Sequence, residues 1–402
     1  MPTVQRKLSR SFKAFFDSEK SSGILLVICT LISLMIANSA IGPSYLGIWD
    51  SYLGGLTVGH WVNDGLMAVF FLLIGLELKR ELTSGELSSF KNALLPIVAA
   101  IGGIIVPALI HLAFNFGSQT QAGIGIPMAT DIAFALGALA ILGTRVPASL
   151  KVLVVAYAVI DDLCAIIVIA IFYTAKVSNA YLAAAVVIWT ILFGLGRFFN
   201  VRSLIPYILG GTLMWFLMLQ SGIHATIAGV LLAFAIPSSY TENDQHSPSQ
   251  LLEHILHKPV AFLILPIFAL CNTGIVIGTN WMQELATANS SGILAGLVLG
   301  KPVGVTLVSF LAVTIGICRL PLDLNWRHVF GAGLLGGIGF TMSIFITNLA
   351  FPGDTEIINS SKMAILLASF TAGTIGFVWL RLFGKPTVSD DDFDTIDYES
   401  AN

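Results

Sequence analysis

The chain has 402 residues, of which 56% are hydrophobic and 11% are charged, and its formal net charge is −3. Soluble domains carry about 25% charged residues, and burial of apolar surface grows too slowly with chain length to enclose this composition. The composition therefore excludes an ordinary water-soluble fold, and the small net charge argues against a nucleic-acid partner. We expect lipid to be the solvent for most of the chain.

Apolar segments of membrane-spanning length recur along the whole sequence. A membrane helix needs about 20 mostly apolar residues. The first segment follows a basic N-terminus like a signal peptide, but it lacks a small-residue cleavage site, so we interpret it as a retained helix. We predict an all-α membrane protein with twelve transmembrane helices, over residues 14–38, 60–78, 93–116, 123–142, 150–173, 181–197, 204–219, 222–237, 259–278, 291–314, 328–350 and 358–382.

The basic residues orient these helices. Cytoplasmic loops carry the excess of Lys and Arg. With the N-terminus inside, nearly all of the 20 Lys and Arg lie on the cytoplasmic side, whereas Lys176 and Lys362 lie outside and Lys301 lies within a span. We therefore predict that both termini are cytoplasmic.

Three segments lie outside the predicted spans. Segment 41–59 is extracytoplasmic and is either a short hairpin or an irregular loop, two alternatives that the sequence leaves open. Segment 238–258 is the longest polar loop, and 386–402 is an acidic cytoplasmic tail. The 4 cysteines show no C-x-x-C spacing, so we predict neither a disulfide framework nor a metal cofactor, and no other cofactor.

Four ionisable residues fall near the middle of predicted spans: Asp131, Asp161, Asp162 and Lys301. Each costs roughly 2.5–3.5 kcal/mol at a helix centre, and such residues usually line an ion or proton path. A purely structural ion pair between Lys301 and one aspartate would explain two of them. It would not explain three carboxylates against one ammonium. We therefore predict an ion site near the membrane midplane.

Asp161 and Asp162 are adjacent, so their side chains point about 100° apart on a helix. One of them can pair with Lys301 while the other faces a cavity. With all four groups ionised the site carries two net negative charges, and carboxylate oxygens bind either protons or a small hard cation. Competition between the two at one alternating-access site is sufficient for exchange. This is a hypothesis about mechanism.

Two predicted spans are poor helices. Segment 123–142 has Pro127 shortly before Asp131, and segment 328–350 is rich in glycine. Irregular backbone at membrane depth persists only inside protein or beside a cavity, and such interruptions point to a transporter site. Close helix packing explains some glycines, but not a proline beside an aspartate. Asp131 could offset facing helix N-termini and Lys301 facing C-termini.

The interrupted segments occupy matching places in the chain. Each is the middle member of a three-span group, 93–173 and 291–382. Counting spans gives the two groups opposite orientations, so we predict an inverted repeat that forms the ion-binding core. Similarity between individual residues of the groups is weak, and the repeat is inferred from the pattern alone.

Six short motifs follow one another in the chain: FFLLIGLELKREL (70–82), PMATDIAFALG (127–137), VIDDL (159–163), SGIHATIAGV (221–230), GKPVG (300–304) and GFTMSIFI (339–346). In this order they resemble the NhaA family of bacterial sodium/proton antiporters, over about residues 10 to 384. Each motif is weak by itself, whereas six in register are specific.

The resemblance implies an electrogenic exchanger in the bacterial inner (cytoplasmic) membrane that expels Na⁺ or Li⁺ in exchange for two protons. By it, Asp162 would be the main carrier and Asp161 would pair with Lys301. Asp131 and Thr130 would lie where the two discontinuous helices cross. The transported Na⁺ or Li⁺ would be bound among Asp162, Asp161 and Asp131.

The resemblance also implies a homodimer, formed through the first extracytoplasmic loop, and activation by alkaline pH. From the residues alone, His254 and His257 could equally be a solvated helix start, and His224 could merely cap the eighth span. The charged run 77–81 could equally be a membrane anchor at the cytoplasmic face. The candidate pH-sensing residues are Glu77, Arg80, Glu81, Glu253, His254, His257 and His224. Cys164 departs from the family pattern, which commonly has Gly there.

Other membrane proteins also use buried aspartates. An intramembrane aspartyl protease would need a G-x-G-D signature, which the sequence lacks, and a channel needs weak binding in an open pore, which a lysine inside an acidic site opposes. A sodium-coupled solute symporter is the closest alternative. It would need clustered polar residues for an organic solute, and we find none in the sequence. We therefore predict a transporter and not an enzyme.

Overall fold

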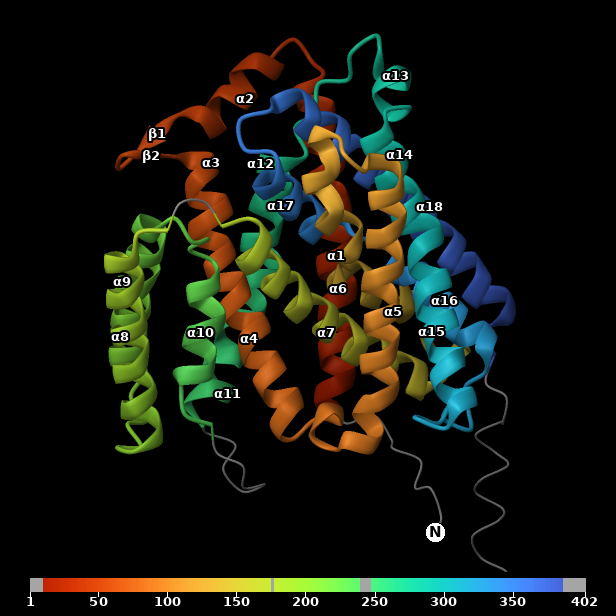
Figure 1. Ribbon diagram of the computed structural model, residues 1–402, viewed down its shortest axis with the longest axis horizontal. Helices are drawn as coiled ribbons and strands as arrows, with labels where there is room; N and C mark the ends of the chain where they lie inside the picture. Colours follow the sequence, from red (N-terminus) through yellow and green to blue (C-terminus); the bar gives the residue numbers. More distant parts are fainter. Residues whose placement is uncertain (1–9, 175–176, 239–246, 386–402) are drawn as a thin grey trace, which may run out of the picture.

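The computed structural model describes residues 10–174, 177–238 and 247–385. Within these ranges the regular secondary structure is helical apart from one pair of two-residue strands, as the composition predicts. Most helices run side by side along one direction (Figure 1). Residues 1–9, Lys176, the acidic tail 386–402 and most of the 238–250 loop lie outside the described residues, so their assignments stay predictions.

The N-terminal part consists of a long helix and a turned-over cap. Helix α1 (Arg10–Ala37) is followed by α2 (Gly42–Asp50), and the two axes differ by 114°. Strands β1 (Tyr52–Leu53) and β2 (Leu56–Thr57) then form an antiparallel hairpin. Its turn contains two glycines with φ of 62° and 90°, which only glycine adopts easily. Of the alternatives that the sequence left open for 41–59, the structure has the hairpin, preceded by a helix.

The next part contains the first interrupted segment and the helix of the paired aspartates. Its elements are α3 (Val58–His60), the π-helical turn η1 (Trp61–Leu66), α4 (Met67–Thr83), η2 (Glu86–Ser88), α5 (Phe90–Asn115), the 3₁₀ helix η3 (Gln119–Met128), α6 (Ile132–Leu142), η4 (Gly143–Arg145), α7 (Ala148–Phe172), α8 (Asn179–Arg197), α9 (Ile205–Ser221) and α10 (Ile227–Ala235).

The last part contains the second interrupted segment. Its elements are α11 (Pro248–Pro259), the π-helical turn η5 (Val260–Ile264), α12 (Leu265–Asn272), α13 (Trp281–Leu285), α14 (Ala288–Ala295), the π-helical turn η6 (Gly296–Gly300), α15 (Lys301–Ile315), α16 (Trp326–Gly336), α17 (Phe340–Ala350) and α18 (Thr355–Phe383).

The number of spans differs from the sequence prediction. In the described part of the chain, 8 helices are long and apolar enough to cross a membrane, or up to 10 if each of two bent helix pairs is one span. The two predicted spans that fall short are the seventh, which is α9, and the eighth, which contains the 9-residue α10. Twelve spans therefore stay a prediction.

The prediction for the ninth span was wrong in position. The helix was expected over 259–278, but it runs over Pro248–Asn272, so the polar loop predicted over 238–258 gives way to helix from Pro248 onward. The Ser247 side chain caps α11 by accepting the amide of Gln250 at 3.4 Å, and proline suits the first helical turn. A cap and a helix-compatible proline outweighed the polar composition.

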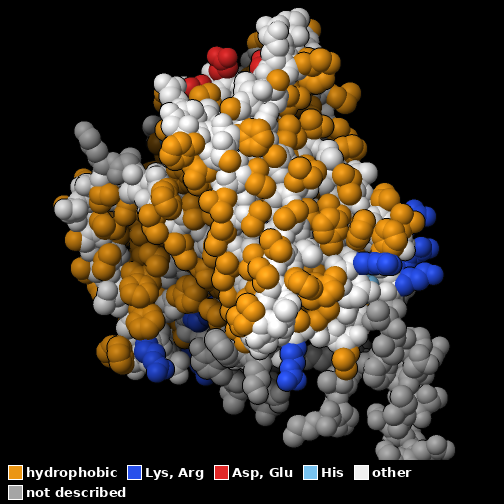
Figure 2. Space-filling model, turned by 45° about the vertical axis from the view of Figure 1, so that its right-hand side comes forward, with side chains coloured by type: hydrophobic (Ala, Val, Ile, Leu, Met, Phe, Trp, Pro, Cys, Tyr) orange, Lys and Arg blue, Asp and Glu red, His pale blue; other side chains and the backbone are white. Residues whose placement is uncertain are grey.

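Small residues allow the central helices to approach closely, while apolar side chains face outward. Helices α5 and α15 meet at Gly102 and Gly304, where a Cβ on either residue would overlap the carbonyl oxygen of the other. Hydrophobic side chains cover the flank of the molecule, with Lys and Arg gathered toward one end and Asp and Glu toward the other (Figure 2). Leu109 on α5 and Ile208 on α9 are about half exposed, as lipid-facing residues should be.

Candidate ion-binding site

The two interrupted segments meet at their breaks. Residues 129–131 separate η3 from α6, and residues 337–339 separate α16 from α17. The amide of Asp131 donates to the carbonyl of Ile338 at 2.6 Å. Each break therefore supplies polar partners to the other, which is how irregular backbone is tolerated deep in a membrane protein.

Asp131 lies between the N-terminal ends of two helices and is 3% exposed. It caps α6, and its Oδ1 accepts the amide of Phe134 at 3.2 Å. Its Oδ2 accepts the amide of Thr341 at 3.0 Å and the hydroxyl of the same residue at 2.6 Å, at the start of α17. A carboxylate is well placed there because helix N-termini carry partial positive charge.

Lys301 forms the complementary half of the centre. Its ammonium makes an ion pair with Oδ2 of Asp161, and both side chains are 0% exposed. The same ammonium donates to the hydroxyl of Thr130 at 3.0 Å and to the carbonyl of Met128. Met128 ends η3, so the cation lies at a helix C-terminus, where the partial charge is negative.

Asp162 points away from this ion pair into a cavity. The cavity has a volume of about 50 Å³, enough for a few water molecules. Oδ1 of Asp162 is buried and has no hydrogen-bond partner among the described residues. The polar residues that line the cavity are Glu77, Thr130, Asp131, Asp162, His257 and Thr341.

The cavity offers oxygen ligands rather than a preassembled carboxylate cage. Within the described ranges, no group of three or more His, Cys, Asp or Glu side chains could hold a metal ion together. Both oxygens of Asp131 and Oδ2 of Asp161 already accept hydrogen bonds. In this conformation an entering cation would therefore meet Asp162, Glu77 and hydroxyl groups first. Oδ1 of Asp161 also has no hydrogen-bond partner among the described residues, but Asp161 does not line the cavity.

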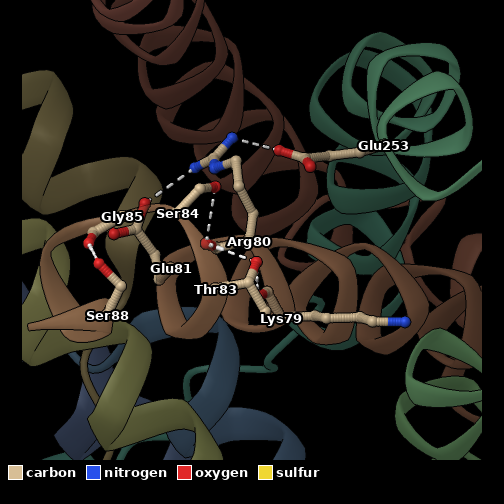
Figure 3. Close-up of polar contacts among 8 residues, drawn as sticks. All are labelled: Lys79, Arg80, Glu81, Thr83, Ser84, Gly85, Ser88 and Glu253. Atoms are coloured by element: carbon tan, nitrogen blue, oxygen red, sulfur yellow. Dashed lines mark hydrogen bonds and ion pairs between the residues drawn. The ribbon is translucent and has the colours of Figure 1, made fainter. Parts of the chain in front are cut away.

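A second polar cluster joins α4 to α11. The guanidinium of Arg80 makes ion pairs with Glu253 and, at 3.2 Å, with Glu81 (Figure 3). Glu77, one turn earlier on α4, is 8% exposed and lines the cavity together with His257. The structure thus connects these predicted pH-sensing residues to the ion site through the cavity wall.

The two remaining predicted pH-sensing residues differ in position. His254 is exposed on α11, one residue from Glu253. His224 precedes α10, and its Nε2 lies 2.7 Å from the carbonyl of Tyr173 at the C-terminal end of α7, away from Arg80 and Glu253. The structure does not bring His224 into the cluster. Lys79 also points away from it (Figure 3).

The model of a family described as Na⁺/H⁺ antiporter 1 matches residues 13–380. The chain belongs to the NhaA family of Na⁺/H⁺ antiporters. It is 66% identical over 383 residues to the Na⁺/H⁺ antiporter NhaA of Dechloromonas aromatica strain RCB, covering 95% of this chain and 98% of the relative. The NhaA of Cytophaga hutchinsonii is 57% identical over 385 residues (96% and 98%), and that of Aliivibrio fischeri MJ11 is 48% identical over 377 (93% and 98%).

Membership in the NhaA family and the apolar helices together make this a multi-pass membrane protein. The relatives are transporters by name, in agreement with the prediction of a transporter rather than an enzyme.

Four residues of the candidate site were not predicted as site residues from the sequence: Tyr157, Thr341, Met128 and Gly336. Tyr157 and Thr341 contact Thr130 and Asp131, respectively. A signal for Tyr157 was present, because it lies one turn before Asp161 and therefore on the same helix face. The carbonyl groups of Met128 and Gly336 carry no signal at all, since every residue has one.

Proposed function

We propose that this NhaA-family chain exchanges Na⁺ or Li⁺ for protons, expelling one cation in exchange for two protons by alternating access. The observation that carries the proposal is the buried oxygen of Asp162, which has no partner among the described residues and faces a cavity of about 50 Å³. A buried carboxylate without a donor is costly. A proton or a small hard cation would relieve that cost, and the two would compete for the same oxygen.

The neighbouring charges support a net movement of charge. Asp161 and Lys301 form a buried pair, and Asp131 is stabilised by two helix N-termini. Asp161, Asp162, Asp131 and Lys301 together carry two net negative charges when all are ionised. Two protons would neutralise them whereas one Na⁺ would not, so the exchange is electrogenic.

The arrangement of helices supports the expected architecture. Helix α5 packs against α15, and the two interrupted segments contact each other, so corresponding members of 93–173 and 291–382 lie together. This favours an inverted repeat with crossing discontinuous helices and twelve spans. We also propose that the protein lies in the bacterial inner membrane with both termini in the cytoplasm, and that it forms a homodimer through residues 41–59. Alkaline pH would activate it through the cluster of Arg80, Glu81 and Glu253.

The test uses purified protein in vesicles that contain a pH-sensitive dye. Addition of Na⁺ or Li⁺ should move protons in the opposite direction, addition of K⁺ at the same ionic strength should not, and the rate should depend on pH. An imposed membrane potential should change the rate, and an unchanged rate would contradict electrogenic exchange. Proton movement only with an added organic solute would favour a sodium-coupled symporter instead.

A further inference from the structure

Tyr157 is the largest side chain in the centre that neither the charges nor the helix breaks explain. It lies on α7, it is 0% exposed, and its hydroxyl is 3.0 Å from the Thr130 hydroxyl. The Lys301 ammonium lies 5.9 Å from the centroid of its ring. A buried tyrosine hydroxyl needs a partner, and this one finds it in the middle of the ion site.

The Thr130 hydroxyl has more neighbours than it can serve at once. Besides Tyr157, it lies 2.6 Å from Oδ2 of Asp161, 2.9 Å from the Gly336 carbonyl and 3.0 Å from the Lys301 ammonium. A hydroxyl donates one proton and accepts at two lone pairs. Lys301 can only donate. If Tyr157 donates as well, both lone pairs are filled, and the Thr130 proton must go to Asp161 or to the Gly336 carbonyl.

The backbone opposite Tyr157 is shaped to receive the phenol. A Cβ on Gly336 would overlap the phenol oxygen and would lie 2.9 Å from Cζ of the ring. Gly336 ends α16, at the second helix break. Tyr157 therefore touches both breaks, one through Thr130 and the other through Gly336.

We propose that Tyr157 is a positioning residue of the ion site, whose hydroxyl orients Thr130 so that its proton supports Asp161 beside Lys301. This inference rests on the proposed exchange of Na⁺ for protons. The charged groups near the phenol in the described chain are Asp161 and Asp162 on its own helix and Lys301 on α15. Tyr157 itself does not contact the transported ion.

The test is Tyr157→Phe, which keeps the ring and removes only the hydroxyl. Loss of one oriented hydrogen bond should raise the apparent KM for Na⁺ about fivefold, with the maximal rate changed less than twofold. If the ring merely fills space, Tyr157→Phe would leave the KM for Na⁺ unchanged, and that result would overturn the inference. So would a loss of maximal rate at an unchanged KM.

A second pair of variants keeps the test decisive if Tyr157→Phe folds poorly. Gly336→Ala should impair Na⁺ transport because its methyl group meets the phenol oxygen, and adding Tyr157→Phe should restore part of the lost activity. Wild-type KM in Gly336→Ala, or no rescue in the double variant, would overturn the inference. If the wild-type protein itself shows no Na⁺-dependent proton movement, the proposed function fails instead.

Discussion

Two clusters in this molecule each place one cation beside carboxylates, and their surroundings differ. At the centre, Lys301 and Asp161 are both 0% exposed. At the junction of α4 and α11, the side chain of Arg80 is 40% exposed and that of Glu253 is 12% exposed. Charges interact far more strongly in a poorly solvated interior than near water. Similar residue types therefore form a fully buried ion pair at the centre and a partly exposed one at the junction.

The two clusters also differ in what holds them. In the centre, helix ends and breaks fix the charged groups, because Asp131 and Lys301 each meet a helix terminus. At the junction, side chains on two helix faces reach toward each other. Substitutions at the centre should therefore change the rate of exchange, whereas substitutions at the junction should change its pH dependence.

The largest effect should follow the loss of the unpartnered carboxylate. Asp162→Asn keeps the shape of the side chain but removes the site where proton and cation compete, so Na⁺-driven proton movement in vesicles should be abolished. Asp50→Asn, at an exposed position at the end of α2, is the matched control and should retain full activity. Normal exchange in Asp162→Asn would contradict the proposal that proton and cation compete at Asp162.

The next effect concerns the stability of the buried pair. Lys301→Met leaves Asp161 as an uncompensated buried charge, which should cost about 3–5 kcal/mol and lower the Tm of the purified protein. Adding Asp161→Asn should recover most of that loss. Lys258→Met, at an exposed position, should leave the Tm unchanged. If the double variant is no more stable than Lys301→Met, the loss of Tm does not come from the uncompensated charge of Asp161.

A smaller effect is expected at the junction of α4 and α11. A double-mutant cycle with Arg80→Gln and Glu253→Gln should give a coupling of about 1 kcal/mol or less, because the pair is partly exposed. This coupling should fall as salt rises, whereas that of Lys301 and Asp161 should not. Equal salt dependence of the two couplings would erase the difference between the clusters.

The smallest effect is expected for His254→Gln. The histidine is exposed one residue from Glu253, so its loss should move the pH profile of transport by about half a unit or less. His60→Gln, also exposed, serves as the control. An unmoved profile would exclude His254 from the sensor.

The sequence was most informative about the apolar segments, because lipid requires apolar spans of a minimum length and penalises charge within them. Apolar length located the helices that are long enough to cross a membrane, although the ninth was shifted in position. The cost of charge at membrane depth pointed to Asp131, Asp161, Asp162 and Lys301 as site candidates. It was least informative at polar helix starts. The beginning of α11 has a polar composition, and its Ser-Pro cap decided the structure.

The division of labour between the two adjacent aspartates shows where sequence reasoning ended. The 100° between neighbouring helical positions requires that Asp161 and Asp162 face different surroundings. Which of them pairs with Lys301 depends on the rotation of α7 against α15, and no local pattern encodes a rotation. In the structure, Asp161 pairs with Lys301 and Asp162 lines the cavity.

The sequence by itself determined a membrane protein with buried charges and two weak helices, because hydrophobic length and glycine or proline placement act locally. The contact of Tyr157 with Thr130 and the separation of His224 from Arg80 became clear only from the packing of the helices. These contacts join residues far apart in the chain. They depend on how whole helices pack, which is set by the sum of many small contacts rather than by any one motif.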